Sequence, residues 1–175
     1  NSLILRDLDI LTDLAKDDLI HVYISITTLN EDLRGVMEPR TASALKRLTT
    51  VSALASAGIP VGIMNAPIIP GLNDHEIPNI LKAASEAGAR TAGMTIVRLN
   101  GSIGIKFDKV WNQISDAHGG SVQDSQFGRR MSGEGAYAEA IHQLFGSSRK
   151  KYFKDRTMPS YDLMKFRKGG TISLF

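Results

Sequence analysis

The residues best suited to binding chemistry lie between Val61 and Asp74. The stretch begins as an apolar run, which is typical of a strand buried on both faces. It continues into residues 67–74, a loop whose two prolines and one glycine would end a strand. A helix is predicted behind this loop, over residues 76–87. Because ligands in β/α folds bind at the carboxyl ends of strands, we expect the working surface of the protein at this loop.

No other motif supplies a nucleophile, a metal site or a nucleotide-binding loop. The chain has no cysteine, which excludes disulfides, thiolate metal sites and a cysteine nucleophile within these residues. Its histidines lack the spacing of a metal site; they are His21, His75, His118 and His142. The GSIG sequence at residues 101–104 is interpreted as a turn, with phosphate binding as the less favoured alternative. We therefore predict no metal ligand and assign no catalytic residue.

Alternating strands and helices must position the loop. We predict strands at residues 1–5, 19–26, 61–66 and 91–99, and helices at residues 8–15, 42–57 and 76–87. Asp7 is the predicted cap of the first helix, and residues 30–40 are a polar connection. Three strand–helix–strand steps with short turns imply parallel strands and right-handed crossovers. The predicted fold class is therefore α/β, with parallel β/α repeats forming an arc of a barrel rather than a closed one.

The repeat ends after Asn100, which divides the chain into two predicted domains. Residues 1–105 form the partial barrel, and residues 106–175 form a helical and basic extension. Within the extension we predict helices at 108–117 and 137–145 and little regular structure beyond residue 146. At the other end, the strand at Asn1 would leave an exposed edge that needs a cover. The chain also opens inside a strand-like run, so we expect a piece of a longer protein whose N-terminal part lies upstream.

Composition and charge narrow the choice of partners. The 175 residues are 42% hydrophobic and 22% charged, as in a soluble globular protein. There is no signal peptide and no apolar run of the ~20 residues that a membrane span needs, so we predict a cytoplasmic protein with no membrane partner. Residues 1–128 carry a net charge of −3 and residues 129–175 a net charge of +6. An anionic partner would meet the C-terminal part, unless that part is simply a solvated tail.

Several short sequences occur in an order and spacing that resemble a known family. They are Ser25–Thr28, Met37–Thr41, Lys46–Leu48, Ala57–Gly62, Ala66–Ile68, Asp124–Met131 and Gly133–Gly135. The set is similar to spore photoproduct lyase and its radical S-adenosylmethionine (SAM) relatives, in particular to bacterial proteins known as DNA repair photolyase-like. The resemblance covers nearly all of the chain. A single short sequence such as Glu-Pro-Arg is weak evidence for the family, and the resemblance rests on the whole set in its order.

The resemblance implies a partial (β/α)6 barrel that holds SAM and a [4Fe–4S] cluster. In such enzymes the cluster reduces SAM to a 5′-deoxyadenosyl radical, which takes a hydrogen atom from the substrate. The cluster is carried by a CxxxCxxC loop after the first strand, and this chain has no such loop. The chain therefore resembles the C-terminal half of the enzyme, inactive alone, with the missing N-terminal half as its partner.

The same resemblance suggests residues that contact SAM. Ser25 falls at the end of the family's fourth strand, where a hydroxyl can bind the carboxylate or ribose of SAM, and Thr27 extends the same face. The alternative is that both are ordinary strand residues. Ile69 and Gly71 match the family's GxIxGxxE pattern and would suit the face of adenine. Asp74 replaces the glutamate of that pattern and has helix capping as its alternative role.

Five further residues are predicted to contact SAM at the mouth of the barrel, where the strands end. They are Glu38, Arg40, Asn65, Arg98 and Leu99. Arg40 could bind the SAM carboxylate as a fork or pair with Glu38. Asn65 could point into the barrel or be only a polar strand residue. Leu99 lies where the family's backbone contacts the edge of adenine, and Arg98 has an ion pair with an acid as its alternative.

The C-terminal cations form a candidate nucleic-acid surface, with aromatic residues between them for stacking. The predicted contacts are Arg129, Arg130, Lys150, Lys151 and Lys154. A cover over the barrel, or an interface with the missing half, is the alternative. The resemblance thus implies the SAM-binding half of a radical SAM enzyme that acts in nucleic-acid lesion repair. The rival is a non-radical β/α domain that binds a small molecule or nucleic acid. The oligomeric state is not predicted.

Overall fold

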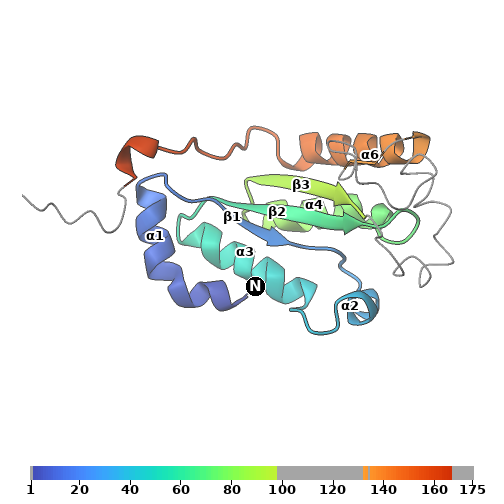
Figure 1. Ribbon diagram of the computed structural model, residues 1–175, viewed down its shortest axis with the longest axis horizontal. Helices are drawn as coiled ribbons and strands as arrows, with labels where there is room; N and C mark the ends of the chain where they lie inside the picture. The colour runs from blue at the N-terminus through green and yellow to red at the C-terminus, as the bar shows by residue number, and fades with distance from the viewer. Residues whose placement is uncertain (1, 98–131, 134, 167–175) are drawn as a thin grey trace, which may run out of the picture.

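A three-stranded parallel sheet organises the protein, seen in a computed structural model that describes residues 2–97, 132–133 and 135–166. Its strands are β1 (Val22–Ser25), β2 (Val61–Ile68) and β3 (Thr91–Ile96), in the order β1-β2-β3 (Figure 1). The register places Ile24 opposite Ile63, and Ile63 opposite Ala92. The predictions of an α/β fold and of parallel neighbouring strands are confirmed.

Two helices connect these strands as the sequence predicts. Helix α3 (Ala44–Ser56) joins β1 to β2, and the Ser43 side chain accepts a hydrogen bond from the Lys46 N–H at its start. Helix α4 (Ile77–Glu86) joins β2 to β3, after a short 3-10 turn η2 (Asp74–Glu76). Gly58 and Gly88 follow the two helices with φ of +79° and +97°. Glycine adopts this left-handed conformation without strain, which explains why each helix ends there.

The N-terminal segment differs from its prediction. Residues 1–5 were expected to be a strand, but Ser2–Asp7 form a 3-10 helix, η1, which leads into α1 (Leu8–Lys16). The short apolar run fits either structure by pattern, and here Ile4 and Leu5 pack against the core while Leu3 is 81% exposed. Asp7 does not cap α1 with its side chain; its carboxylate binds Arg6 instead. The described part of the chain therefore has three strands instead of four, with β1 at an edge.

Smaller differences surround the predicted strands. β1 spans four residues rather than the predicted 19–26. The polar connection at 30–40 contains a helix, α2 (Glu31–Met37), whose N-terminus is capped by the Asn30 side chain. β2 continues through Pro67 to Ile68, two residues further than predicted, with an irregular register against β3 between Asn65 and Ile68.

The core lies between one face of the sheet and the helices. Alternate residues of the strands point to this face and are almost fully buried: Val22, Ile24, Val61, Ile63 and Ala92. α3 and α4 pack on the sheet and contribute Val51, Leu54, Ile80 and Leu81. The opposite face, which we call the inner face, carries Tyr23 and Ser25, both exposed. Parallel strands with helices on one face are compatible with part of a TIM barrel.

Helix α6 (Ala136–Tyr152) packs against α4 and runs beside β3 (Figure 1). It extends seven residues beyond the predicted end at Phe145, because Ser148 remains buried and the Ser85 hydroxyl bonds the Tyr152 carbonyl. Ile141 and Phe145 join the core formed by the sheet. The following chain returns to the start of β1, where Tyr161 stacks on His21, and forms the short turn η4 (Leu163–Lys165). The predicted helix at 108–117 and the predicted domain boundary lie outside the described residues.

Candidate functional site

Several of the predicted residues lie together where β1 and β2 terminate. We call this end of the sheet, at the C-terminal ends of the strands, the carboxyl edge. β1 ends at Ser25 and β2 ends at Ile68, and the loop that follows β2 closes over the residues after β1. Ser25 lies on the inner face, is exposed, and its hydroxyl has no partner within the described residues. A hollow of about 300 Å³ beside β1 is lined by Ile4, Tyr23, Ile24, Ser25 and Arg47. Ser25 is thus available to a ligand at the carboxyl edge.

Glu38 and Arg47 form a partly buried ion pair behind Ser25. The Arg47 side chain is only 6% exposed, and its guanidinium binds the Glu38 carboxylate. It also donates to the Ser25 carbonyl at 2.8 Å and to the Ala42 carbonyl at 2.9 Å. The Thr27 hydroxyl lies 2.7 Å from Glu38 Oε1, so Thr27 is buried in this network and does not share the exposure of Ser25. The pair therefore fixes the end of β1.

The ion pair of Glu38 does not involve the arginine that was predicted as its partner. The sequence offered Arg40 as the partner of Glu38, but Arg40 is exposed and Arg47 makes the contact. Arg47 lies four and seven residues before Val51 and Leu54, on the buried stripe of α3. A cation at helical spacing with core residues is a signal of a buried pair that the sequence analysis did not use.

Glu38 is held in its charged form. Burial alone would raise the pKa of its carboxyl, but the Thr27 hydroxyl and the Arg47 guanidinium outweigh it and lower the pKa below the ordinary value. A carboxyl with a lowered pKa in the folded state stabilises the fold above its unfolded pKa, near 4.3, and loses that contribution as the pH falls through the folded pKa.

This sign gives a testable pH dependence. In urea unfolding between about pH 3 and pH 7, the Glu38→Gln variant should show a shallower loss of stability on acidification than the wild type. Glu86→Gln is the control, because that side chain is 68% exposed on α4. If the free energy of unfolding of Glu38→Gln fell as steeply with falling pH as that of the wild type, Glu38 would not contribute to the acid sensitivity.

A second buried network, which the sequence analysis missed, ties the loop after β2 to the residues after β1. The Glu76 carboxylate accepts hydrogen bonds from the Thr28 hydroxyl and, at 2.7 Å, from the Leu29 N–H. The Asn73 amide donates to the Thr27 carbonyl at 2.9 Å and accepts from the Ile69 N–H at 2.6 Å. Glu76 is the last residue of η2 and directly precedes α4, four residues before the buried Ile80, and this helical spacing is the signal that could have revealed it.

Asn65 lies on the helix-covered face of β2, in alternation with Val61 and Ile63. Its amide nitrogen donates to the Ile26 carbonyl at 2.9 Å, and its buried Oδ1 has no hydrogen-bond partner among the described residues. A buried acceptor without a donor costs about 1–3 kcal/mol. Asn65 therefore does not point to the inner face, as one of its two interpretations expected, but it retains one unused acceptor near the carboxyl edge.

The remaining predicted residues differ in exposure, and some lie outside the described part of the chain. Ile69 is 1% exposed within the protein, while Gly71 is exposed with a φ of +74°. Asp74 makes no helix cap; its carboxylate accepts from the Tyr137 hydroxyl of α6 at 2.9 Å. Burial and this carboxylate raise the pKa of the Tyr137 phenol. Arg98, Leu99, Arg129 and Arg130 lie outside the described residues.

Within the described residues, no three His, Cys, Asp or Glu side chains gather into a set that could hold a metal ion. None of the helices in that part of the chain is long and apolar enough to cross a membrane.

The fold is an α/β fold that is compatible with part of a TIM barrel, and comparison with known proteins shows which family the chain resembles. Residues 1–84 match the family model of the radical SAM superfamily. The match runs from η1 into α4, so it includes β1, β2 and the loop at 67–74. It supports a radical SAM-type function.

Three uncharacterised proteins illustrate the relatives of this chain. Rv2578c of Mycobacterium tuberculosis and Mb2609c of Mycobacterium bovis are each 28% identical over 101 residues, which is 57% of this chain and 29% of theirs. ORF301 of Acidianus two-tailed virus is 37% identical over 68 residues, which is 39% of this chain and 22% of the viral protein. The matched part of the chain thus spans under a third of each relative. No solved structure matches it.

Proposed function

We propose that this chain supplies the SAM-binding strands of a radical SAM enzyme. The observation that carries the proposal is the superfamily match over residues 1–84, which includes the two strands that end at the candidate site. We place the protein in the spore photoproduct lyase and DNA repair photolyase-like branch, on the ordered short sequences from Ser25 to Gly135. Bound SAM would supply, on reduction, the radical that abstracts hydrogen from the substrate.

The donor set at the carboxyl edge fits SAM. Ser25 offers a free, exposed hydroxyl to its carboxylate or ribose, and the exposed turn at Gly71 allows close approach of a ligand to the backbone. Arg47, which lines the same hollow as Ser25, would hold the Ser25 carbonyl in place, and Glu76 would hold Thr28.

The chain's own residues do not fit the iron–sulfur cluster. The 175 residues contain no cysteine, and thiolates are the ligands of [4Fe–4S] clusters. We therefore propose that the CxxxCxxC loop lies upstream of Asn1 in a longer parent, with the missing N-terminal half as the partner of this one. Nucleic-acid lesion repair is the reaction that the proposed branch suggests.

The test is anaerobic reconstitution with iron and sulfide. The 175-residue chain should remain colourless, and the full-length parent should become brown with the visible absorbance of a [4Fe–4S] cluster. A parent whose upstream sequence lacks clustered cysteines, and which stays colourless, would contradict the proposal. That result would favour the rival, a non-radical β/α domain that binds a small molecule or nucleic acid.

A further inference from the structure

A cluster of unneutralised cations lies at the C-terminal end of α6. We call it the basic end; it consists of Arg90, Arg149, Lys150, Lys151, Lys154 and Arg156. All six side chains are exposed, and none of them forms an ion pair with a carboxylate in the described part of the chain. Asp155 lies among them.

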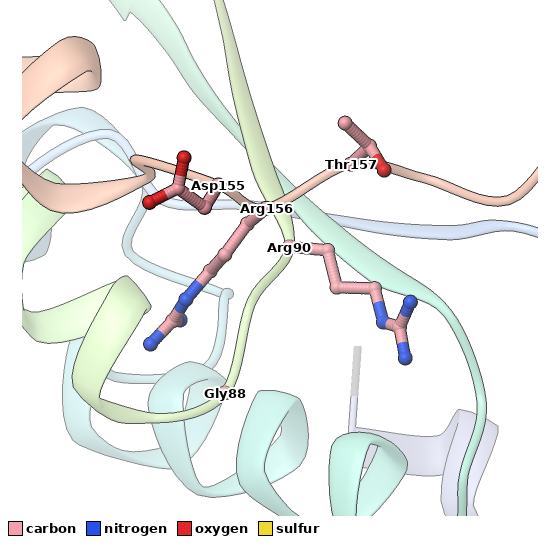
Figure 2. Close-up of a pocket in the computed structure, with 5 residues that line it drawn as sticks. All are labelled: Gly88, Arg90, Asp155, Arg156 and Thr157. Atoms are coloured by element: carbon pink, nitrogen blue, oxygen red, sulfur yellow. The ribbon is translucent and has the colours of Figure 1, made fainter.

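Hydrogen bonds hold the basic end at the amino end of β3. The Arg149 guanidinium donates to the Thr91 hydroxyl at 3.2 Å, and Thr91 is the first residue of β3. Arg156 donates to the Ser85 carbonyl in the last turn of α4 at 2.8 Å and to the Ala89 carbonyl just after α4 at 2.9 Å. Figure 2 shows Arg90 and Arg156 diverging from the point where the segment after α6 passes the start of β3.

This placement separates the basic end from the candidate site. β3 spans six residues, and a strand rises about 3.3 Å per residue, so roughly 20 Å lies between the two ends of the sheet. A ligand at the carboxyl edge near Ser25 does not reach Lys150 or Lys154. The basic end is therefore a surface for a partner of its own, rather than a wall of the proposed cofactor site.

The surface is hollowed in two adjoining places. One hollow, of about 400 Å³, is lined by Gly88, Arg90, Asp155, Arg156 and Thr157. The other, of about 560 Å³, is lined by Gly146, Arg149, Lys150, Phe153, Lys154 and Arg156. They share Arg156, so together they present an extended cationic surface to a ligand with repeated negative charges.

Structural roles account for only part of this charge. Cations in the last turn of a helix stabilise its dipole, which favours Arg149, Lys150 and Lys151 in α6. Arg156 is engaged with the carbonyls at the end of α4. Neither role applies to Arg90 or Lys154, and each added cation repels the others in the absence of an anion.

We propose that the basic end binds the phosphodiester backbone of a nucleic acid and anchors the protein without reading sequence. The exposed side chains of the cluster are cations, and its aromatic Phe153 is 6% exposed, so it offers phosphate contacts and no apolar side chain to enter a bilayer. The large apolar side chains that are most exposed in this part of the chain, Leu163 and Met164, belong to η4 instead. The proposal does not depend on SAM binding.

The test uses fluorescence anisotropy with a labelled DNA duplex of about 20 base pairs and the 175-residue chain at a series of salt concentrations. The triple variant Lys150→Gln, Lys151→Gln, Lys154→Gln should bind at least ~10-fold more weakly near 0.1 M salt, and the slope of log affinity against log salt should fall by about 2–3. The matched control is Lys16→Gln, Lys46→Gln, Lys82→Gln, which removes the same charge from exposed positions elsewhere.

The outcomes distinguish DNA binding at the basic end from attraction of DNA to the positive charge of the protein as a whole. Loss confined to the first variant, with circular dichroism unchanged, supports the proposal. Equal losses in both variants, or wild-type affinity without salt dependence, would overturn it. Binding to vesicles of anionic phospholipid as tight as to DNA at the same salt would also overturn it, in favour of a membrane surface. SAM binding, measured in parallel, should be the same for all three proteins, whether or not the proposed function holds.

Discussion

Replacement of Arg47 by methionine should lower the free energy of unfolding by about 2–3 kcal/mol. Removal of one partner from a fully buried ion pair costs ~3–5 kcal/mol, and we take a lower value because water partly reaches Glu38. Glu38 is 24% exposed, whereas Arg47 is 6% exposed. The variant would also leave the Ser25 and Ala42 carbonyls without their guanidinium donor. Urea unfolding of the 175-residue chain measures the loss.

Two further variants make this result specific. Adding Glu38→Gln to Arg47→Met should recover part of the lost stability, because the unpaired carboxylate is then removed. Lys82→Met is the control, since its pair with Glu86 joins side chains that are 57% and 68% exposed, and such pairs contribute under about 1 kcal/mol. If Arg47→Met were no more destabilising than Lys82→Met, the pair would not hold the end of β1.

The second large effect should come from Glu76. Glu76→Ala leaves the Leu29 N–H and the Thr28 hydroxyl without their acceptor in a buried site, which we expect to cost about 2–4 kcal/mol in total. Glu76→Gln should cost less than half of this, because an amide oxygen can still accept one of the two bonds.

The control for Glu76 lies on α4, the helix that Glu76 directly precedes. Glu86→Ala changes an exposed residue at the other end of α4 and should change stability by no more than about 0.5 kcal/mol. Equal unfolding midpoints for Glu76→Ala and Glu86→Ala would contradict a structural role for the network. A loss in Glu76→Ala that Glu76→Gln fully shares would show that the charge, rather than the accepted hydrogen bonds, is what matters.

The elements with strong local signals were predictable from the sequence. α3, α4 and β2 have apolar residues at the right spacing, and Gly58 and Gly88 mark the helix ends, so their existence and order were correct. The parallel pairing of β1, β2 and β3 followed from the short connections between them. The spacing of apolar residues was enough to predict these elements, because each of them is long enough to show the period of a helix or of a strand.

Where local patterns were ambiguous, tertiary packing decided the structure. Residues 2–7 are too short for periodicity to separate a strand from a helical turn, and their packing against α3 favours the turn. α6 runs past the predicted end because the Ser85 hydroxyl, 67 residues away, bonds the Tyr152 carbonyl. A polar segment such as residues 146–152 carries no sequence signal of that contact.

The candidate site was predictable in position but not in its bonding. The carboxyl edge follows from the strand order, and Ser25 lies there as expected. Which arginine reaches Glu38 depends on how α3 packs: the helical spacing of Arg47 with Val51 and Leu54 indicates that its side chain is buried, but it does not indicate which carboxylate it meets. The bond between Thr28 and Glu76 joins residues 48 apart, which only the folded chain brings together.

The most direct test of the proposed SAM site is cleavage of SAM by the full-length parent under reducing, anaerobic conditions. After cluster reconstitution, the wild-type parent should convert SAM to 5′-deoxyadenosine and methionine, detected by liquid chromatography. A Ser25→Ala parent with the same cluster content should show a higher KM for SAM. A parent that carries an intact, reducible cluster and releases no 5′-deoxyadenosine would contradict the assignment.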